Sequence, residues 1–254
     1  MSGRGFPGVY ACVLCLSAGV LPAPILTMMP ASALAADFPD SARAREAAAR
    51  VQPALERDFA AKHLDFGTPI YLRIFKREAQ LELWLRGADG KYVLFREYPV
   101  CKFSGDLGPK QREGDNQAPE GFYSVAPRQL NPQSNYHLAF NLGYPNAYDH
   151  AHGRTGSALM VHGNCVSIGC YAMGDAGIEE IYTLSAAALR AGQGVFPVHI
   201  FPFRPTVAAL AAAKNSPWFG FWSELAPAYD FFEREHVPPA IEVDGDRYRI
   251  AAAR

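Results

Sequence analysis

Three segments between residues 70 and 100 alternate apolar side chains with polar or aromatic ones, and this pattern restricts the fold more than any other feature. The segments span 70–75, 81–86 and 92–100. A period of two is typical of β-strands. The sequence Gly87-Ala88-Asp89-Gly90 predicts a turn between the second and third segments, so these two form a hairpin. Successive hairpins favour an antiparallel sheet over a parallel one.

Other segments predict helices and further strands around this sheet. Apolar residues at helical spacing predict a helix from Ser41 to Lys62, which Pro53 would kink or split. A second helix is expected through 175–191, with Asp175 as its N-cap and Gly192 ending it. Buried strands are expected over 122–127 and 195–201. The region 130–154 shows no regular pattern, and so long a loop often forms one wall of a functional groove.

The composition changes after residue 204. Residues 205–214 are rich in alanine and predict a helix, and 216–235 contain many aromatic residues, for which we expect packing against the main domain. A small hairpin is expected over 237–250, turning at Asp244-Gly245.

The first 35 residues have the features of a secretory signal peptide. Arg4 supplies a positive charge, residues 9–20 are apolar, and Ala33-Leu34-Ala35 resembles a cleavage site. Prolines interrupt the segment, so we expect no stable membrane insertion after cleavage. A lipid anchor at Cys12 or Cys15 is an alternative, but the residues before them fit a lipidation site poorly. The segment predicts export, and therefore a periplasmic protein.

Charge and cysteine content narrow the functional class. The formal net charge is −1 and no basic run occurs, which argues against a nucleic-acid partner. Five cysteines are present, and removal of the leader would leave Cys101, Cys165 and Cys170. An odd number in an exported protein predicts at least one free thiol.

The segment from residue 162 to 173 contains the parts of a thiol-based acyl-transfer site. A cysteine attacks carbonyl groups as its thiolate, so it needs a proton acceptor nearby. His162 lies eight positions before Cys170, after an apolar segment, 157–161, that predicts a short buried strand. The glycines of this segment allow backbone N–H groups to approach a developing oxyanion.

Residues 167–173 resemble the S-x-G-C-x-R-M signature of the L,D-transpeptidase (YkuD-like) catalytic domain, and His162-Gly163 resembles the His-Gly pair upstream of it. Residues 119–123 resemble the family's "P-x-G-x-Y/F" strand start. The short spacing between histidine and cysteine is similar to the YafK-like branch. The resemblance covers roughly 68–204.

The resemblance implies a fold and a domain organisation. We expect a mainly β, α+β fold, with a sandwich-like catalytic domain over 68–204. A helical segment over 36–67 would precede it, and an aromatic-rich helical extension over 205–254 would follow.

The resemblance also implies the chemistry. Cys170 is the nucleophile, His162 is the base, and the carbonyl of Gly163 orients the imidazole. The backbone amides of Gly169 and Cys170, with that of Ile168, form the oxyanion hole. For Ser167 two roles are open, namely holding the loop through its own backbone or bonding to His162.

The expected substrates are diaminopimelate-containing stem peptides of peptidoglycan, joined to new amines through a thioester acyl-enzyme. No cofactor or metal is implied. His150, His152, His162, Cys165 and Cys170 are residue types that bind zinc, but their spacing fits no standard zinc pattern.

One residue departs from the signature, because Ala172 replaces the usual arginine. Arg154 is a candidate to replace some of its function by holding a carboxylate, or else it is a solvated loop residue. The aromatic residues Tyr136, Tyr144 and Tyr171 are further candidates for substrate contacts.

Several alternatives remain open at the level of sequence. Cys165 is expected to be a loop-packing thiol, with Cys101 or Cys170 as alternative disulfide partners. The same site could hydrolyse its acyl-enzyme, including release of a wall-linked lipoprotein. Two other classes of function are also open, namely an inactive module that binds the cell wall and a thiol peptidase that acts on ordinary proteins.

Overall fold

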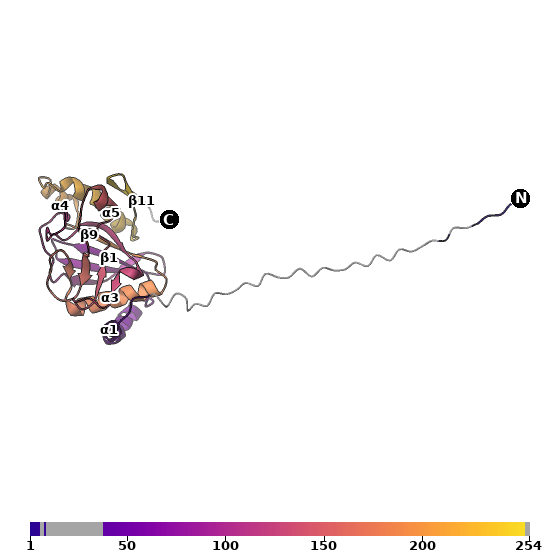
Figure 1. The fold of residues 1–254 in the computed structure, drawn as a ribbon, viewed down its shortest axis with the longest axis horizontal. Coiled ribbons are helices and arrows are strands. Elements are labelled where there is room, and N and C mark those ends of the chain that lie inside the picture. Colours follow the sequence, from indigo (N-terminus) through magenta and orange to yellow (C-terminus); the bar gives the residue numbers. More distant parts are fainter. Residues whose placement is uncertain (6–7, 9–37, 252–254) are drawn as a thin grey trace. The chain divides into compact units, whose positions relative to one another are not determined.

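The computed structural model describes residues 1–5, 8 and 38–251 (Figure 1), and residues 38–251 belong to one compact unit. The predicted signal peptide lies almost entirely outside the described residues. Within the described part of the chain, no helix is both long and apolar enough to cross a membrane.

The larger sheet has five strands in the order β3-β2-β1-β9-β4. The strands are β1 (Ile70–Phe75), β2 (Gln80–Arg86), β3 (Tyr92–Pro99), β4 (Gly121–Val125) and β9 (Phe196–Phe201). The predicted antiparallel pairing of β1, β2 and β3 is confirmed. However, β9 pairs with β1 in parallel, so the sheet expected to be antiparallel is mixed. Parallel neighbours need a long crossover connection, and the chain between β1 and β9 includes the helix α3 (Gly174–Arg190).

The second sheet has four short strands in the order β5-β6-β7-β8. They are β5 (Leu130–Asn131), β6 (Ala139–Asn141), β7 (Met160–His162) and β8 (Tyr171–Ala172). The region expected to be irregular therefore contains two strands, and also a short helix, α2 (Ala147–Ala151). A 3-10 turn, η2 (Pro127–Gln129), precedes β5. These elements are too short to leave a periodic signal in the sequence.

Both sheets and α3 (Gly174–Arg190) contribute to one hydrophobic core. Leu72 and Leu83 come from the larger sheet, Phe140 and Val161 from the smaller one, and Ile178 from α3. Each of these side chains is fully buried, which stabilises the fold by about 1.5–3 kcal/mol per residue. The predicted mixed α+β class is confirmed.

Helix α1 (Ala42–Ala61) begins after Ser41, whose hydroxyl accepts a hydrogen bond from the Ala44 N–H at 3.0 Å. It is a single helix, with Pro53 inside it, so the predicted split does not occur. Arg50 of α1 forms an ion pair with Glu179 of α3 at 2.8 Å. Helices α1 and α3 thus pack together along one side of the strands (Figure 1).

The C-terminal region consists of α4 (Val207–Ala212), α5 (Phe219–Glu235) and a hairpin of β10 (Ala240–Asp244) and β11 (Arg247–Ala251). Aromatic residues of α5 share a core cluster with Phe75 and Phe201 of the larger sheet. This confirms the expectation that they pack against the main domain. Arg73 of β1 is buried and bonds to Glu82 on β2 and to Glu233 on α5. The ion pairs fix α5 onto the sheet.

Candidate active site

Strands β7 and β8 bring His162 and Cys170 to neighbouring positions. The two strands are parallel, with Val161 opposite Tyr171, so Cys170 lies opposite Met160, two residues before His162. Met160 confirms this register, because its N–H donates to Cys170 Sγ at 3.4 Å. The thiol therefore lies against the backbone of β7, two residues before His162, although no hydrogen bond joins it to the imidazole among the described residues.

The imidazole of His162 is held in one orientation by its neighbour. Its ring is buried, with 2% of the residue exposed, and Nδ1 lies 2.6 Å from the carbonyl oxygen of Gly163. A carbonyl oxygen only accepts hydrogen bonds, so Nδ1 must carry the proton. In the neutral ring this leaves Nε2 as a proton acceptor, which is the form a general base requires.

A glycine is required at position 163. A Cβ atom there would lie 2.7 Å from the carboxylate of Asp175 and 2.9 Å from the carbonyl oxygen of Tyr136. Both contacts are shorter than atoms tolerate, so any side chain would displace the carbonyl that orients His162. The Gly163 N–H donates to the carbonyl oxygen of Leu138 at 3.0 Å, which fixes this peptide further.

The environment of the pair keeps both groups neutral. Burial lowers the pKa of His162 below its usual 6.5, and the bond to Gly163 opposes this only in part. Burial raises the pKa of the Cys170 thiol above its usual 9.0, although the Met160 N–H and the charge of Lys110 act in the opposite direction. At neutral pH the two groups are therefore a thiol and an unprotonated imidazole.

These shifts predict the pH dependence of turnover. Below the pKa of His162 the base is protonated, so activity rises with pH through a midpoint below 6.5. It then stays constant until the thiol ionises above 9.0. The measurement is kcat/KM from about pH 4.5 to about pH 10. An acid limb with a midpoint above neutrality would contradict the neutral pair.

The loop 163–170 carries the expected oxyanion donors. Gly169 has a φ of +140°, which is a conformation that glycine alone adopts readily. Its N–H donates to Ser167 Oγ at 3.1 Å, so it is engaged in the resting site. The N–H groups of Ile168 and Cys170 have no partner within residues 38–251. Of the three donors expected for an oxyanion, these two have no partner in the described part of the chain.

Ser167 holds this loop through its own backbone. Its hydroxyl donates to the carbonyl oxygen of Cys170 at 2.7 Å and lies 3.2 Å from the hydroxyl of Ser104. Of the two roles expected for Ser167, the contacts match the bond to the loop backbone. The hydroxyl therefore fixes the peptide that carries the nucleophile.

The expectation that Cys165 is a packing thiol is wrong. It forms a disulfide with Cys101, and the Cα atoms of the two residues are 5.5 Å apart. Cys170 is the free cysteine of the described chain, and it is half-buried. The sequence does not predict this pairing because it depends on a contact between distant segments. The chain just after β3 runs beside the loop 163–170, and Lys102 forms a β-bridge with Ala172 there.

The four side chains predicted to contact substrate lie in different surroundings. Tyr136 is 42% exposed and its ring centroid is 4.8 Å from that of His162, so it flanks the base. Tyr144 and Tyr171 are buried and bond to backbone carbonyls. Arg154 is buried and forms an ion pair with Asp149 at 2.8 Å. The alternative prediction, that Arg154 is a solvated loop residue, is therefore wrong. Substrate contact by these four residues stays a prediction.

Two residues near the site were not found by sequence reasoning. Asp175 is expected to cap α3, but the N-cap is Met173. The carboxylate of Asp175 instead accepts a hydrogen bond from the Asn164 N–H at 2.7 Å. Asp175 thus fixes the turn after His162. Lys110 is the charge that acts on the Cys170 thiol. An isolated lysine in a polar loop gives no sequence signal for this role.

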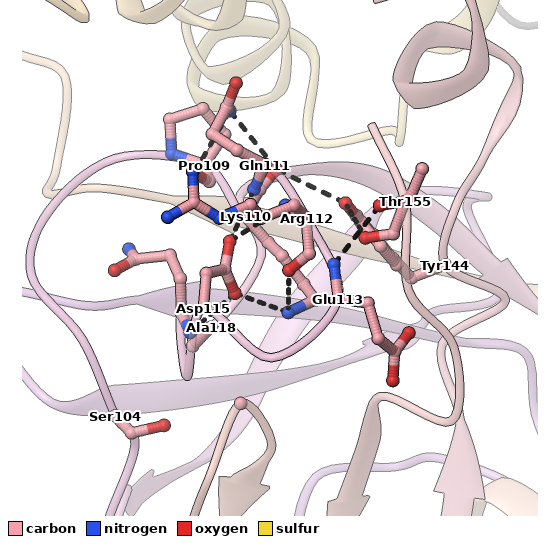
Figure 2. A network of polar contacts seen from close by, with 12 residues as sticks. Ser104, Pro109, Lys110, Gln111, Arg112, Glu113, Asp115, Ala118, Tyr144 and Thr155 are labelled. Carbon is pink, nitrogen blue, oxygen red and sulfur yellow. Dashed lines mark hydrogen bonds and ion pairs between the residues drawn. The ribbon is translucent and has the colours of Figure 1, made fainter. Parts of the chain in front are cut away.

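Lys110 belongs to a network that shapes the loop 101–118 (Figure 2). Its ammonium group is buried and bonds to Asp115 at 2.5 Å and to the carbonyl oxygen of Arg112 at 3.0 Å. The Tyr144 hydroxyl donates to the backbone oxygen of Lys110, and Thr155 accepts the Glu113 N–H. The network joins this loop to the 144–155 region, so the two segments are held together beside the site.

A groove of about 490 Å³ is lined by Ala158, which lies just before β7, but its lining does not include His162 or Cys170. The Ala158 carbonyl oxygen accepts a weak contact from Cys170 Sγ at 3.8 Å. The groove is lined by polar groups, and Arg128 adds an exposed guanidinium. Across the described ranges, no group of three or more His, Cys, Asp or Glu side chains could hold a metal ion.

Comparison with known proteins agrees with this geometry. The family model "YkuD: L,D-transpeptidase catalytic domain" matches residues 70–200, which is more than half of the chain. The chain belongs to the L,D-transpeptidase (YkuD) family. The protein named "Putative L,D-transpeptidase YafK" of Escherichia coli K12 is 49% identical over 185 residues, covering 73% of this chain and 75% of that relative. The protein of the same name in E. coli O157:H7 matches equally.

Two solved structures that match the chain are less similar to it in sequence. The helical cell shape determining protein Pgp2 of Campylobacter jejuni, as a K307A mutant, has a TM-score of 0.43 and 19% identity, covering 70% of this chain and 72% of that one. Bd1075 of Bdellovibrio bacteriovorus has a TM-score of 0.38 and 20% identity, covering 66% of this chain and 55% of that one.

Proposed function

We propose that this protein is a periplasmic cysteine acyltransferase that acts on the stem peptides of peptidoglycan. The observation that carries the proposal is the free thiol of Cys170, whose sulfur contacts the backbone of β7 at Met160, two residues before the oriented imidazole of His162. Membership of the L,D-transpeptidase family supports the reaction class. We include in the proposal that residues 1–35 direct export. We also include the division of the rest of the chain into a helical segment (36–67), a catalytic domain (68–204) and a C-terminal extension (205–254).

The first half of the reaction forms a thioester. Nε2 of His162 takes the thiol proton as Sγ of Cys170 bonds to the carbonyl carbon of a diaminopimelate residue. The N–H groups of the catalytic loop receive the oxyanion, and each such donor contributes about 3 kcal/mol to stabilising the transition state. The imidazolium then gives its proton to the leaving amine, and the C–N bond breaks.

The second half transfers the acyl group to an acceptor. The acceptor loses a proton to Nε2 of His162 and bonds to the thioester carbonyl, and the C–S bond breaks. The sulfur then regains the proton. An amine acceptor gives a cross-link or an attached protein, whereas water gives a free carboxylate.

The groove beside Ala158 suits the substrate class. It is open and polar, and a stem peptide is itself a polar, extended chain. Stem peptides carry carboxylates, and the exposed guanidinium of Arg128 is a group that binds a carboxylate bidentately. The exposed ring of Tyr136 would border the bound peptide on the side of His162.

Hydrolysis at the same site is a second candidate, and one observation favours it. Position 172 holds a fully buried alanine, so no guanidinium lies two residues after the nucleophile to order a second substrate. With a less ordered amine acceptor, water competes for the thioester. The hydrolytic products would include shortened stems and a lipoprotein released from the wall.

The test is mass spectrometry of purified muropeptides incubated with the mature protein, with and without an added amine. We expect loss of the residue after diaminopimelate in both reactions. With the amine, a transferase also gives a product heavier by the amine, whereas a hydrolase gives only the free carboxylate. Stems with an L-residue after diaminopimelate are the matched control, and they should stay intact. Unchanged muropeptides in every reaction would refute the proposal.

A further inference from the structure

The disulfide between Cys101 and Cys165 lies inside the proposed active site. Cys165 is in the middle of the loop 163–170, between His162 and Cys170, and Cys101 follows the end of β3. Both cysteines are exposed. The bridge therefore connects the larger sheet directly to the loop that carries the oxyanion donors.

The rest of this loop is held mainly at its two ends. Asp175 accepts the Asn164 N–H at the start, and Ser167 bonds within the final turn. Between these points the side chains of Val166 and Ile168 are 49% and 78% exposed, so burial does not hold them. The Cys165 N–H bonds only to the neighbouring Asn164 side chain. The disulfide is thus the main long-range link at the centre of the loop.

Neighbouring contacts follow the same path. The N–H of Ala172 donates to the carbonyl oxygen of Lys102 at 2.8 Å, and the Ala172 oxygen accepts the Cys101 N–H at 2.8 Å. Ser104 contacts Ser167 at 3.2 Å. Residues 101–104 therefore form a support for the loop, and the disulfide is its covalent part. These hydrogen bonds would be the remaining support after reduction of the bridge, and only the contact between Ser104 and Ser167 reaches the loop itself.

We propose that the Cys101–Cys165 bridge positions the oxyanion donors, so that the enzyme reaches its full rate only when the bridge is oxidised. The two cysteines are positioning residues, since neither touches the reacting atoms. This inference rests on the proposed acyl transfer. Loosening the loop moves the N–H groups of Ile168 and Cys170 away from the oxyanion, which lowers kcat more than it raises KM.

The test compares the oxidised protein with the protein reduced by a water-soluble phosphine. The phosphine and one water molecule convert the disulfide to two thiols and a phosphine oxide, and no thiol reagent is added that could accept the acyl group. Since losing one oxyanion donor costs about 100–1000-fold in kcat, a loosened loop should lose at least about tenfold. The double variant Cys101→Ser/Cys165→Ser should show the same loss and no further response to phosphine.

The outcomes separate this inference from the proposed function. Muropeptides unchanged by the oxidised protein would overturn both. Turnover by the oxidised protein with an equal kcat after reduction, when mass spectrometry shows the bridge open, would overturn the positioning role alone. A lower thermal midpoint with an unchanged kcat below that midpoint would overturn it too, because it indicates a purely structural bridge. If the double variant does not fold, the reduced wild-type protein, kept below its midpoint, decides between these results.

Discussion

Cys170→Ala is expected to abolish turnover of stem peptides, by roughly 10⁴-fold or more, while the protein stays folded. The thiol supplies the electron pair that forms the thioester, and no other described cysteine is free. Cys170 is half-buried and makes only two weak sulfur contacts, so its removal disturbs little packing. The measurements are muropeptide turnover and the thermal midpoint of the same preparation.

A mass measurement checks the same assignment without a natural substrate. A carbapenem has a strained amide that acylates an activated thiol, so it should add once to the wild-type protein and not to Cys170→Ala. The double variant Cys101→Ser/Cys165→Ser removes two cysteines and keeps Cys170, so it should still add one carbapenem, but more slowly because its loop is loosened. Turnover retained by Cys170→Ala would remove the basis of the proposed mechanism.

His162→Gln is expected to lower kcat by about 1000-fold and to change KM little. The amide of glutamine cannot take the thiol proton. In this variant the sulfur therefore attacks only after the thiol has lost its proton to water or hydroxide. Burial raises the pKa of Cys170 above 9.0, so the residual rate of this variant should keep rising in alkaline solution. The acid limb set by His162 should disappear.

The control for this variant is His150→Gln. His150 is exposed on α2 and belongs to none of the contacts around the nucleophile, so its replacement should leave the pH profile unchanged. A His162→Gln protein with a wild-type acid limb would show that another group is the base.

The sequence was informative where the signal is local. The strands β1, β2 and β3 follow from alternation within six to eight residues, and the two proposed catalytic residues lie within a segment of twelve. The hydrogen bond from His162 to the Gly163 carbonyl joins adjacent residues, so the expected geometry needed no tertiary information. The pKa directions could not be predicted in this way, because they depend on burial.

The errors concern contacts between distant segments. The disulfide partner of Cys165 is 64 residues away, and only the return of the chain beside β3 decides the pairing. Arg154 could be expected in solvent because its partner, Asp149, gives no sequence signal, and because one of the two aromatic rings under its guanidinium, Phe221, belongs to the distant helix α5. Asp175 was assigned to its own helix, whereas its carboxylate bonds to a backbone N–H eleven residues earlier.

The C-terminal helix is connected to the base of the loop 101–118. The indole N–H of Trp222 on α5 donates to Glu120 at 2.8 Å, and Glu120 is fully buried beside Lys76 at 3.0 Å. Glu120 also accepts the Gly108 N–H at 2.7 Å. Detaching α5 would leave this buried carboxylate short of one donor, at a cost of about 1.5–3 kcal/mol before any lost aromatic packing. The attachment of α5 therefore also helps to hold Gly108 in its loop, through the carboxylate that both contact.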